Sequence, residues 1–152
     1  MSLFDRQAIP QEFLSYYNEN QQSPEFKGRL QLTKGLGVLK AFSFVVDDKS
    51  HGLSMHRLVH LATRQWLDNK GMICYFAGQT LLAVSHHYPY GGFENRAICG
   101  AYLWYVHAVL KFEDNGSDNG VVVAKASLLH CAAGFYCYRG LWKDADTFLL
   151  QR

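Results

Sequence analysis

The chain of 152 residues lacks a secretory signal, since Met1 leads into "SLFDRQ", with an early aspartate and no apolar core. No apolar run approaches the roughly 18 residues that span a bilayer. Both absences predict a cytoplasmic protein without a membrane partner. Charge is also sparse: charged residues make up 18% of the chain, and the formal net charge is +2. This balance favours no particular class of charged partner.

Motifs for catalysis and metal binding are missing as well. No GxxxxGK[ST] loop is present, so the chain alone is expected to bind neither ATP nor ADP. His56 and His60 have the spacing of metal ligands on a helix, but Arg57 replaces the glutamate of HExxH and no third ligand follows nearby. His130 and Cys131 are neighbours on a predicted helix, so they point about 100° apart and do not favour a nucleophile pair. We therefore predict no enzyme and no metal site.

The cysteines and two further histidines have structural interpretations. His86 and His87 end a predicted helix, where a cationic side chain suits the helix dipole. No CxxC pair is present, and apolar helical surroundings predict reduced core residues for all four cysteines: Cys74, Cys99, Cys131 and Cys137.

Apolar residues make up 49% of the chain and recur mostly at helical spacing. Two short runs of strand formers, Phe44–Val46 and Leu53–Met55, surround the turn cluster "DDKSHG" and predict a β-hairpin. Ser54 is predicted to cap the helix that follows. The helices are predicted at residues 10–17, 24–42, 54–69, 71–88, 93–112, 121–140 and 142–152.

Two features of the predicted helices bear on packing. In the helix 24–42, glycines at positions 28, 35 and 37 mark either a close backbone contact or a break near Gly35. In the helix 54–69, one broad face is apolar and is expected to be buried: Met55, Leu58, Val59, Leu61, Ala62 and Trp66. Most aromatic residues of the second half are expected in the core for the same reason.

The order of elements predicts a mainly α protein with one small hairpin. Residues 1–69 are predicted to contain three helical segments, the first of them before Ile9, and then a hairpin and a fourth helix. This order is the plan of a winged-helix domain. Residues 70–152 are predicted to form antiparallel helical pairs with short loops, and the boundary near Asn69 is a change in composition.

Four stretches of the sequence resemble a known family: "MSLFDRQAIPQEFL", "GVLKAFSFV", "MHRLVHLATRQWL" and "YPYGGFENRAICGAYL". In this order they are similar to fungal NB-ARC proteins, which are STAND-type ATPases related to NLR immune receptors and often end in tetratricopeptide repeats of the kinesin-light-chain kind. The resemblance implies that residues 1–69 form a winged-helix domain that packs on an ATPase module, in cis or in trans, and holds it closed around ADP.

His56 is the site residue that the resemblance implies. Met55 and His56 match the first two residues of the family's Met-His-Asp motif, whose histidine contacts the phosphate of ADP, while Arg57 replaces the aspartate. A histidine in the first turn of a helix suits an anion, because the helix N-terminus carries partial positive charge. An exposed structural histidine is the alternative. Any ADP or ATP contact requires an assembly that contains the P-loop module.

The C-terminal helical pair resembles the start of a tetratricopeptide repeat, with Ala133, Tyr136, Ala145 and Leu149 in the expected order. The chain ends before the roughly 34 residues of a repeat are complete, and both ends are expected to be truncated relative to longer relatives. An incomplete repeat leaves one face without a neighbour. We therefore expect a protein partner or self-association through Tyr136, Trp142 and Leu149.

Two other functions remain open from the sequence. Lys27, Arg29 and Lys34, together with Lys40, give the helix 24–42 a basic side that suits a DNA-binding winged helix, although the hairpin turn carries two aspartates where phosphate contacts need cations. The chain is alternatively a truncated fragment without independent activity. The main hypothesis is a non-catalytic regulatory and interaction segment.

Overall fold

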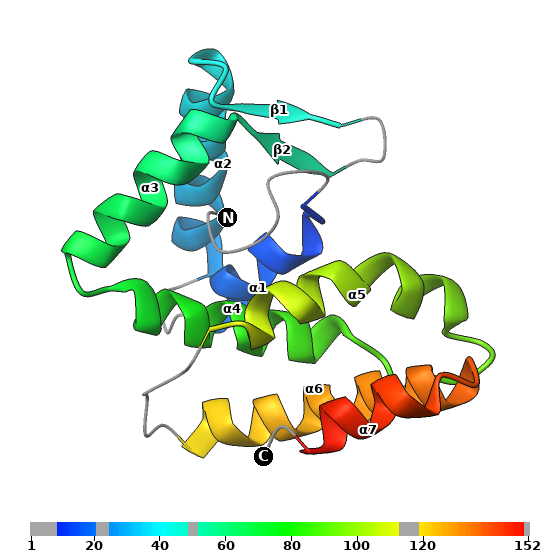
Figure 1. Cartoon of the computed structure of the whole chain (residues 1–152). Helices are drawn as coiled ribbons and strands as arrows, with labels where there is room; N and C mark the ends of the chain where they lie inside the picture. The colour runs from blue at the N-terminus through cyan, green and yellow to red at the C-terminus, as the bar shows by residue number, and fades with distance from the viewer. Residues whose placement is uncertain (1–8, 21–24, 49–51, 113–118, 151–152) are drawn as a thin grey trace. The chain divides into compact units, whose positions relative to one another are not determined.

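The computed structural model of the chain describes residues 9–20, 25–48, 52–112 and 119–150, with side chains at residues 17–20 and 25–32 excepted. It confirms a mainly α protein with one small antiparallel hairpin (Figure 1). The helical segment predicted before Ile9 lies outside the described residues. The elements follow the chain as α1 Glu12–Asn20, α2 Glu25–Ala41, β1 Val45–Asp47, β2 Leu53–Met55, α3 Arg57–Asn69, α4 Ile73–His87, α5 Arg96–Leu110, α6 Asn119–Tyr138 and α7 Trp142–Leu150.

The chain divides into two compact units, Met1–Ile73 and Cys74–Arg152. The first contains α1, α2, the hairpin and α3, and the second contains nearly all of α4 together with α5, α6 and α7. The division falls a few residues after the change of composition at Asn69. Whether the units are a winged helix and the beginning of a repeat stays a prediction.

The core of the first unit forms around the hairpin. Val45 pairs with Met55 and Asp47 with Leu53. Ile9 adds a bridge to the free edge of β2 through two 2.8 Å backbone hydrogen bonds with Leu53, which the sequence did not predict. Side chains on the inner face of the hairpin are buried with a residue of α1, because successive residues of a strand point to opposite faces. The buried cluster is Leu14, Val45, Leu53 and Met55.

Helices α2, α3 and α6 end in the same hydrogen-bonded turn. At the end of α2, the Phe44 N–H donates to Leu39 and the Ser43 N–H to Lys40, each at 2.9 Å. At the ends of α3 and α6, Gly71 and Gly140 take the position of Ser43, and the φ values of Ser43, Gly71 and Gly140 are 56°, 65° and 74°. This is a Schellman motif, which supplies donors for the last carbonyl groups of a helix. It explains why α7 can follow α6 after so short a loop.

Gly35 and Gly37 mark neither of the features expected of them. Helix α2 is continuous through both positions, and a Cβ added at either would meet no atom within 4 Å. Neither a break nor a close backbone contact therefore requires glycine there.

Replacing Gly37 by alanine is expected to raise the free energy of unfolding of the first unit by up to about 1 kcal/mol, because alanine loses less backbone entropy in a helix. Urea denaturation of the variant beside the wild type measures the change in midpoint. Gly35→Ala should behave alike, and an unchanged or lower midpoint in both variants would show that these positions are constrained in some other way.

The second unit is built on α6, which runs antiparallel to α7 (Figure 1). Its core includes Cys99 and Val106 of α5 and Leu128 and Phe135 of α6. Helix α6 has 20 residues and a mean hydropathy of 1.4, enough by length and composition to cross a membrane, which corrects the prediction that no segment approaches this length. Of its apolar window, 44% is buried inside the structure, as in many core helices.

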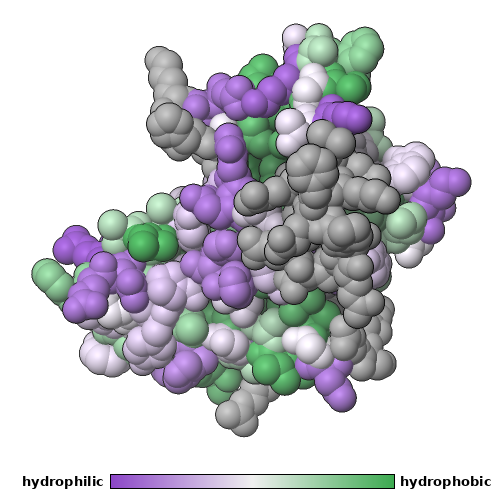
Figure 2. Space-filling model, turned by 180° about the vertical axis from the view of Figure 1, so that it is seen from behind, coloured by the Kyte–Doolittle hydropathy of each residue, from purple (hydrophilic) through white to green (hydrophobic). Residues whose placement is uncertain are grey.

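Burial in the second unit differs from expectation at several aromatic residues and one cysteine. Tyr105 and Tyr136 are buried, but Phe93, Trp104 and Trp142 are exposed. Cys99 is buried and Cys74 is exposed, with Cys131 and Cys137 between, so a core role for all four cysteines is wrong. Helical spacing groups apolar residues on a face, but it does not say whether another element covers that face. Figure 2 shows hydrophobic areas interrupting the hydrophilic surface on one side of the molecule.

Candidate functional site

His56 is the N-cap of α3, a position predicted for Ser54. Its backbone is extended, with φ −60° and ψ 135°, and its Nδ1 accepts a hydrogen bond from the Leu58 N–H at 3.3 Å. Ser54 lies inside β2, because the strand continues to Met55 and the His56 N–H donates to the Phe44 carbonyl at 3.0 Å. The hairpin therefore delivers His56 to the first turn of the helix, with its side chain exposed.

Helix α3 presents an apolar face that no described element of the first unit covers. Leu58 is 68% exposed, Leu61 51% and Trp66 53%. The sequence predicted burial for the whole apolar face, and that prediction is wrong for these three residues. Met55 is buried as predicted, Val59 packs against the hairpin cluster, and Leu67 is buried on the other side of the helix. We call Leu58, Leu61 and Trp66 the α3 face. Arg57 and Arg64, both exposed on the same helix, add positive charge beside it.

The residues of the DNA-binding alternative are only partly described. Lys34 is exposed on α2, whereas the side chains of Lys27 and Arg29 lie outside the described part. Lys40 forms an ion pair with Asp47 of β1, with its Nζ 2.7 Å from Oδ1. Asp47, at the turn end of β1, thus pairs with a lysine that a contact to DNA phosphates would need.

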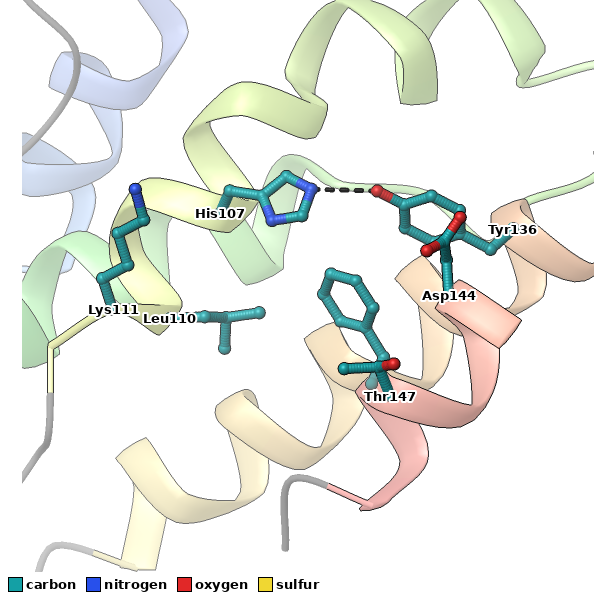
Figure 3. A pocket seen from close by; sticks show the side chains of 7 residues that line it. His107, Leu110, Lys111, Tyr136, Asp144 and Thr147 are labelled. Atoms are coloured by element: carbon teal, nitrogen blue, oxygen red, sulfur yellow. Dashed lines mark hydrogen bonds between the residues drawn. The ribbon is translucent and has the colours of Figure 1, made fainter. Parts of the chain in front are cut away.

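A pocket of about 380 Å³ opens in the second unit among the C-terminal end of α5, α6 and α7 (Figure 3). His107 and Tyr136 meet across it, with His107 Nε2 2.9 Å from the Tyr136 hydroxyl. Phe148 packs on both rings. Its ring centroid lies 5.2 Å from that of Tyr136 in a stacked arrangement and 5.3 Å from that of His107 in an edge-on arrangement. The other lining residues are Leu110, Lys111, Asp144 and Thr147.

The electrostatics of this pocket follow from partial burial and two opposite charges. Burial lowers the pKa of His107 below its ordinary 6.5, Lys111 lowers it further, and Asp144 opposes the change. Burial also raises the pKa of the Tyr136 hydroxyl, with a further increase from Asp144. Near neutral pH the pair is therefore a neutral imidazole and a protonated phenol.

This pH response gives a testable prediction for stability. The unfolded chain protonates His107 near pH 6.5, but the folded chain does so only at lower pH, so acid favours the unfolded state between the two pKa values. We expect the free energy of unfolding to fall as the pH is lowered from about 7.5 to about 5.5, and to fall less in His107→Gln. Urea midpoints at several pH values measure both curves. If the free energy of unfolding falls equally with pH in the wild type and in His107→Gln, the pH dependence does not come from His107.

Packing explains two of the thiols and two further histidines. Burial raises the pKa of Cys99 and of Cys131, which keeps both thiols protonated. His130 stacks near Tyr90, with ring centroids 5.4 Å apart. His87 Nδ1 lies 2.9 Å from the Ala83 carbonyl near the end of α4, as its helix-end position suggested. Among the described residues, no three His, Cys, Asp or Glu side chains are grouped as metal ligands.

The structure separates the three residues expected to contact a partner. Trp142 and Leu149 are exposed on α7, but Tyr136 is buried and bonded to His107. Phe148, rather than Leu149, is the large buried side chain of α7 beside Ala145. The sequence patterns did not predict a role for His107. A single histidine inside the apolar run "AYLWYVHAVL" was the available signal, since a partly buried imidazole requires a hydrogen-bond partner.

Comparison with known proteins supports a relationship at the level of NLR-like proteins. The chain is 34% identical over 116 residues to a "nucleotide-binding leucine-rich repeat (NLR)-like protein" from the fungus Hyaloscypha variabilis. The match covers 76% of this chain and 12% of that protein, so the chain spans a small part of its relative's length. No family model matches the chain, and no solved structure does. Over about three quarters of its length, the chain is similar to a segment of a fungal NLR-like protein.

Proposed function

We propose that the chain is a non-catalytic regulatory segment of a cytoplasmic NLR-type protein, and that its first unit docks through α3 onto a nucleotide-binding module. The observation that carries the proposal is the α3 face, an apolar surface on a helix whose first turn is capped by His56. The similarity to an NLR-like protein supplies the class of partner, because that relative is named as nucleotide-binding. The module acts in cis within a longer chain or in trans.

The α3 face has the composition of an interface centre. Large apolar side chains that stay exposed on a helix, with charged residues at the edge, are typical of protein contacts. Trp66 is the type of residue that dominates binding energy at such contacts. Arg57 and Arg64 favour an acidic surface on the partner, since opposite charges steer association.

His56 is suited to a second role at the same contact. Its Nδ1 accepts from the Leu58 N–H, so in the neutral ring the proton lies on Nε2, which remains able to donate. The first turn of α3 also carries partial positive charge, and Arg57 adds a full one where the family's motif has aspartate. These groups would hold a phosphate of ADP that is bound by the partner module. The chain alone has no P-loop for this.

Docking is tested by calorimetric titration of the chain into the nucleotide-binding part of the Hyaloscypha variabilis relative. Leu58→Ser combined with Trp66→Ser is expected to weaken binding at least about tenfold. Val46→Ser is the matched control, because Val46 is equally exposed on the hairpin and lies outside the α3 face. Absence of binding by the wild type, or equal losses in the two variants, would refute the docking.

Two substitutions separate the capping and phosphate roles of His56. His56→Ser keeps an N-cap side chain but removes the ring nitrogen, and His56→Ala removes both. We expect ADP to dissociate from the joined modules several-fold faster in both variants, while the stability of α3 falls only in the alanine variant. ADP release from His56→Ser at the wild-type rate would leave His56 with a capping role alone.

DNA binding is the competing function, and it is tested on the same chain. Affinity for a DNA duplex that falls steeply with salt, and is lost in Lys27→Glu combined with Lys34→Glu, would favour the winged-helix DNA reader instead. The Lys40–Asp47 ion pair favours the protein partner.

A further inference from the structure

The second unit contains a pocket that the docking of α3 does not use. Its volume, about 380 Å³, lies in the range of sites for small molecules. Phe148 and Leu110 form apolar walls, and a few polar groups converge between them, which is the usual composition of a ligand site. These residues belong to three consecutive helices, so ligand binding would join the end of α5 to the α6–α7 pair.

The contact between His107 and Tyr136 is compatible with two tautomers of the neutral imidazole. The Tyr136 hydroxyl keeps its proton, and His107 Nε2 is its hydrogen-bond partner among the described residues. In the tautomer with Nε2 as the acceptor of the Tyr136 O–H, the neutral ring carries its hydrogen on Nδ1. No described residue accepts a hydrogen bond from Nδ1, and Figure 3 shows this nitrogen on the side of the ring toward Leu110. In this tautomer the pocket contains an N–H donor whose ring is oriented by Tyr136.

Two opposite charges lie on either side of this donor. Figure 3 shows Lys111 and Asp144 on opposite sides of the His107 ring. Both are exposed, and neither forms an ion pair with a described residue. An ammonium group and a neutral N–H at one side of the pocket select an anion with two acceptor oxygens, because charge-assisted hydrogen bonds are the strong ones. The carboxylate at the other side repels a second negative charge.

We propose that this pocket binds a small monocarboxylate with an apolar body. Lys111 Nζ and His107 Nδ1–H donate to the carboxylate, and the body lies between Leu110 and Phe148. Asp144 disfavours dicarboxylates and leaves room for an ammonium group. The same chemistry is supplied by a free small acid and by the C-terminal residue of a peptide.

The experiment follows the histidine ring signals of the whole chain by NMR during titration. The probes are 3-phenylpropanoate, the isosteric 3-phenylpropanamide, and the peptide acetyl-Gly-Gly-Phe with a free carboxylate. We expect a saturable shift of the His107 signals with 3-phenylpropanoate at a dissociation constant on the order of 1 mM, and none with the amide. Tighter binding of the peptide would identify a C-terminus as the source, and tighter binding of the acid a free metabolite.

Matched lysine variants complete the test. Lys111→Gln is expected to weaken 3-phenylpropanoate binding about tenfold, because a charge-assisted hydrogen bond is lost. Lys143→Gln removes the same charge from an exposed position outside the pocket and should have no effect. The proposal is overturned if neither carboxylate shifts His107, if the amide binds equally well, or if the two variants behave alike.

Discussion

Gly91→Ala is expected to lower the free energy of unfolding of the second unit by roughly 3 kcal/mol, the upper part of the range for overpacking. A Cβ at this position would lie 2.3 Å from both the Cα and the N of Phe135. These are backbone atoms of α6, so no side-chain rotation relieves the overlap. The loop would have to move away from the helix, and Phe135, which is fully buried, would lose contacts.

The neighbouring glycine supplies the control. A Cβ at Gly92 would meet no atom within 4 Å, and neither glycine has a positive φ, so Gly92→Ala should leave stability nearly unchanged. Hydrogen exchange of α6 amides, together with urea midpoints, measures both variants. Equal stability of Gly91→Ala and Gly92→Ala would show that the loop does not lie on α6 as described.

Leu53→Ala is expected to destabilise the first unit by about 2–5 kcal/mol. Leu53 is 0% exposed and lies in the cluster formed with Leu14, Val45 and Met55. Truncation removes apolar contacts and leaves a cavity that a two-stranded hairpin, held by few neighbours, fills poorly. The backbone hydrogen bonds between Leu53 and Ile9 remain available, so the loss reports on side-chain packing.

The opposite face of the same hairpin gives the comparison. Val46 is 53% exposed, so Val46→Ala should cost less than about 1 kcal/mol. Amide exchange in α1, α2 and the hairpin distinguishes the two variants. A similar small effect of both substitutions would mean that the hairpin is not anchored through Leu53. His56 and the α3 face depend on that anchor, because the hairpin leads directly into α3.

The predicted secondary structure agrees with the structure because its signals are local. Pro89 and Gly140 follow the ends of α4 and α6, and the strand formers at Phe44–Val46 and Leu53–Met55 are found in the two arms of the hairpin, one arm displaced by a residue. Backbone sterics at proline and glycine act over a few residues, so the sequence around them is sufficient.

The candidate sites were predictable only in part. His56 was identified through its resemblance to a family motif. Its role as N-cap was not predicted, because it depends on where β2 ends. The hydrogen bond from the His56 N–H to the Phe44 carbonyl lies at that end. The pocket around His107 was not predicted. Tyr136 lies 29 residues further along the chain, and nothing local to either residue reports that they meet.

The sequence by itself determined the class of fold, the order of its helices and hairpin, and the absence of a P-loop motif, because composition, periodicity and turn residues act locally. Only the tertiary structure decided which apolar faces are buried. The periodicity of α3 is that of a core helix, yet Leu58, Leu61 and Trp66 are exposed, since burial depends on a neighbouring element and not on the pattern itself. The same long-range packing placed His107, Lys111 and Asp144 around one pocket.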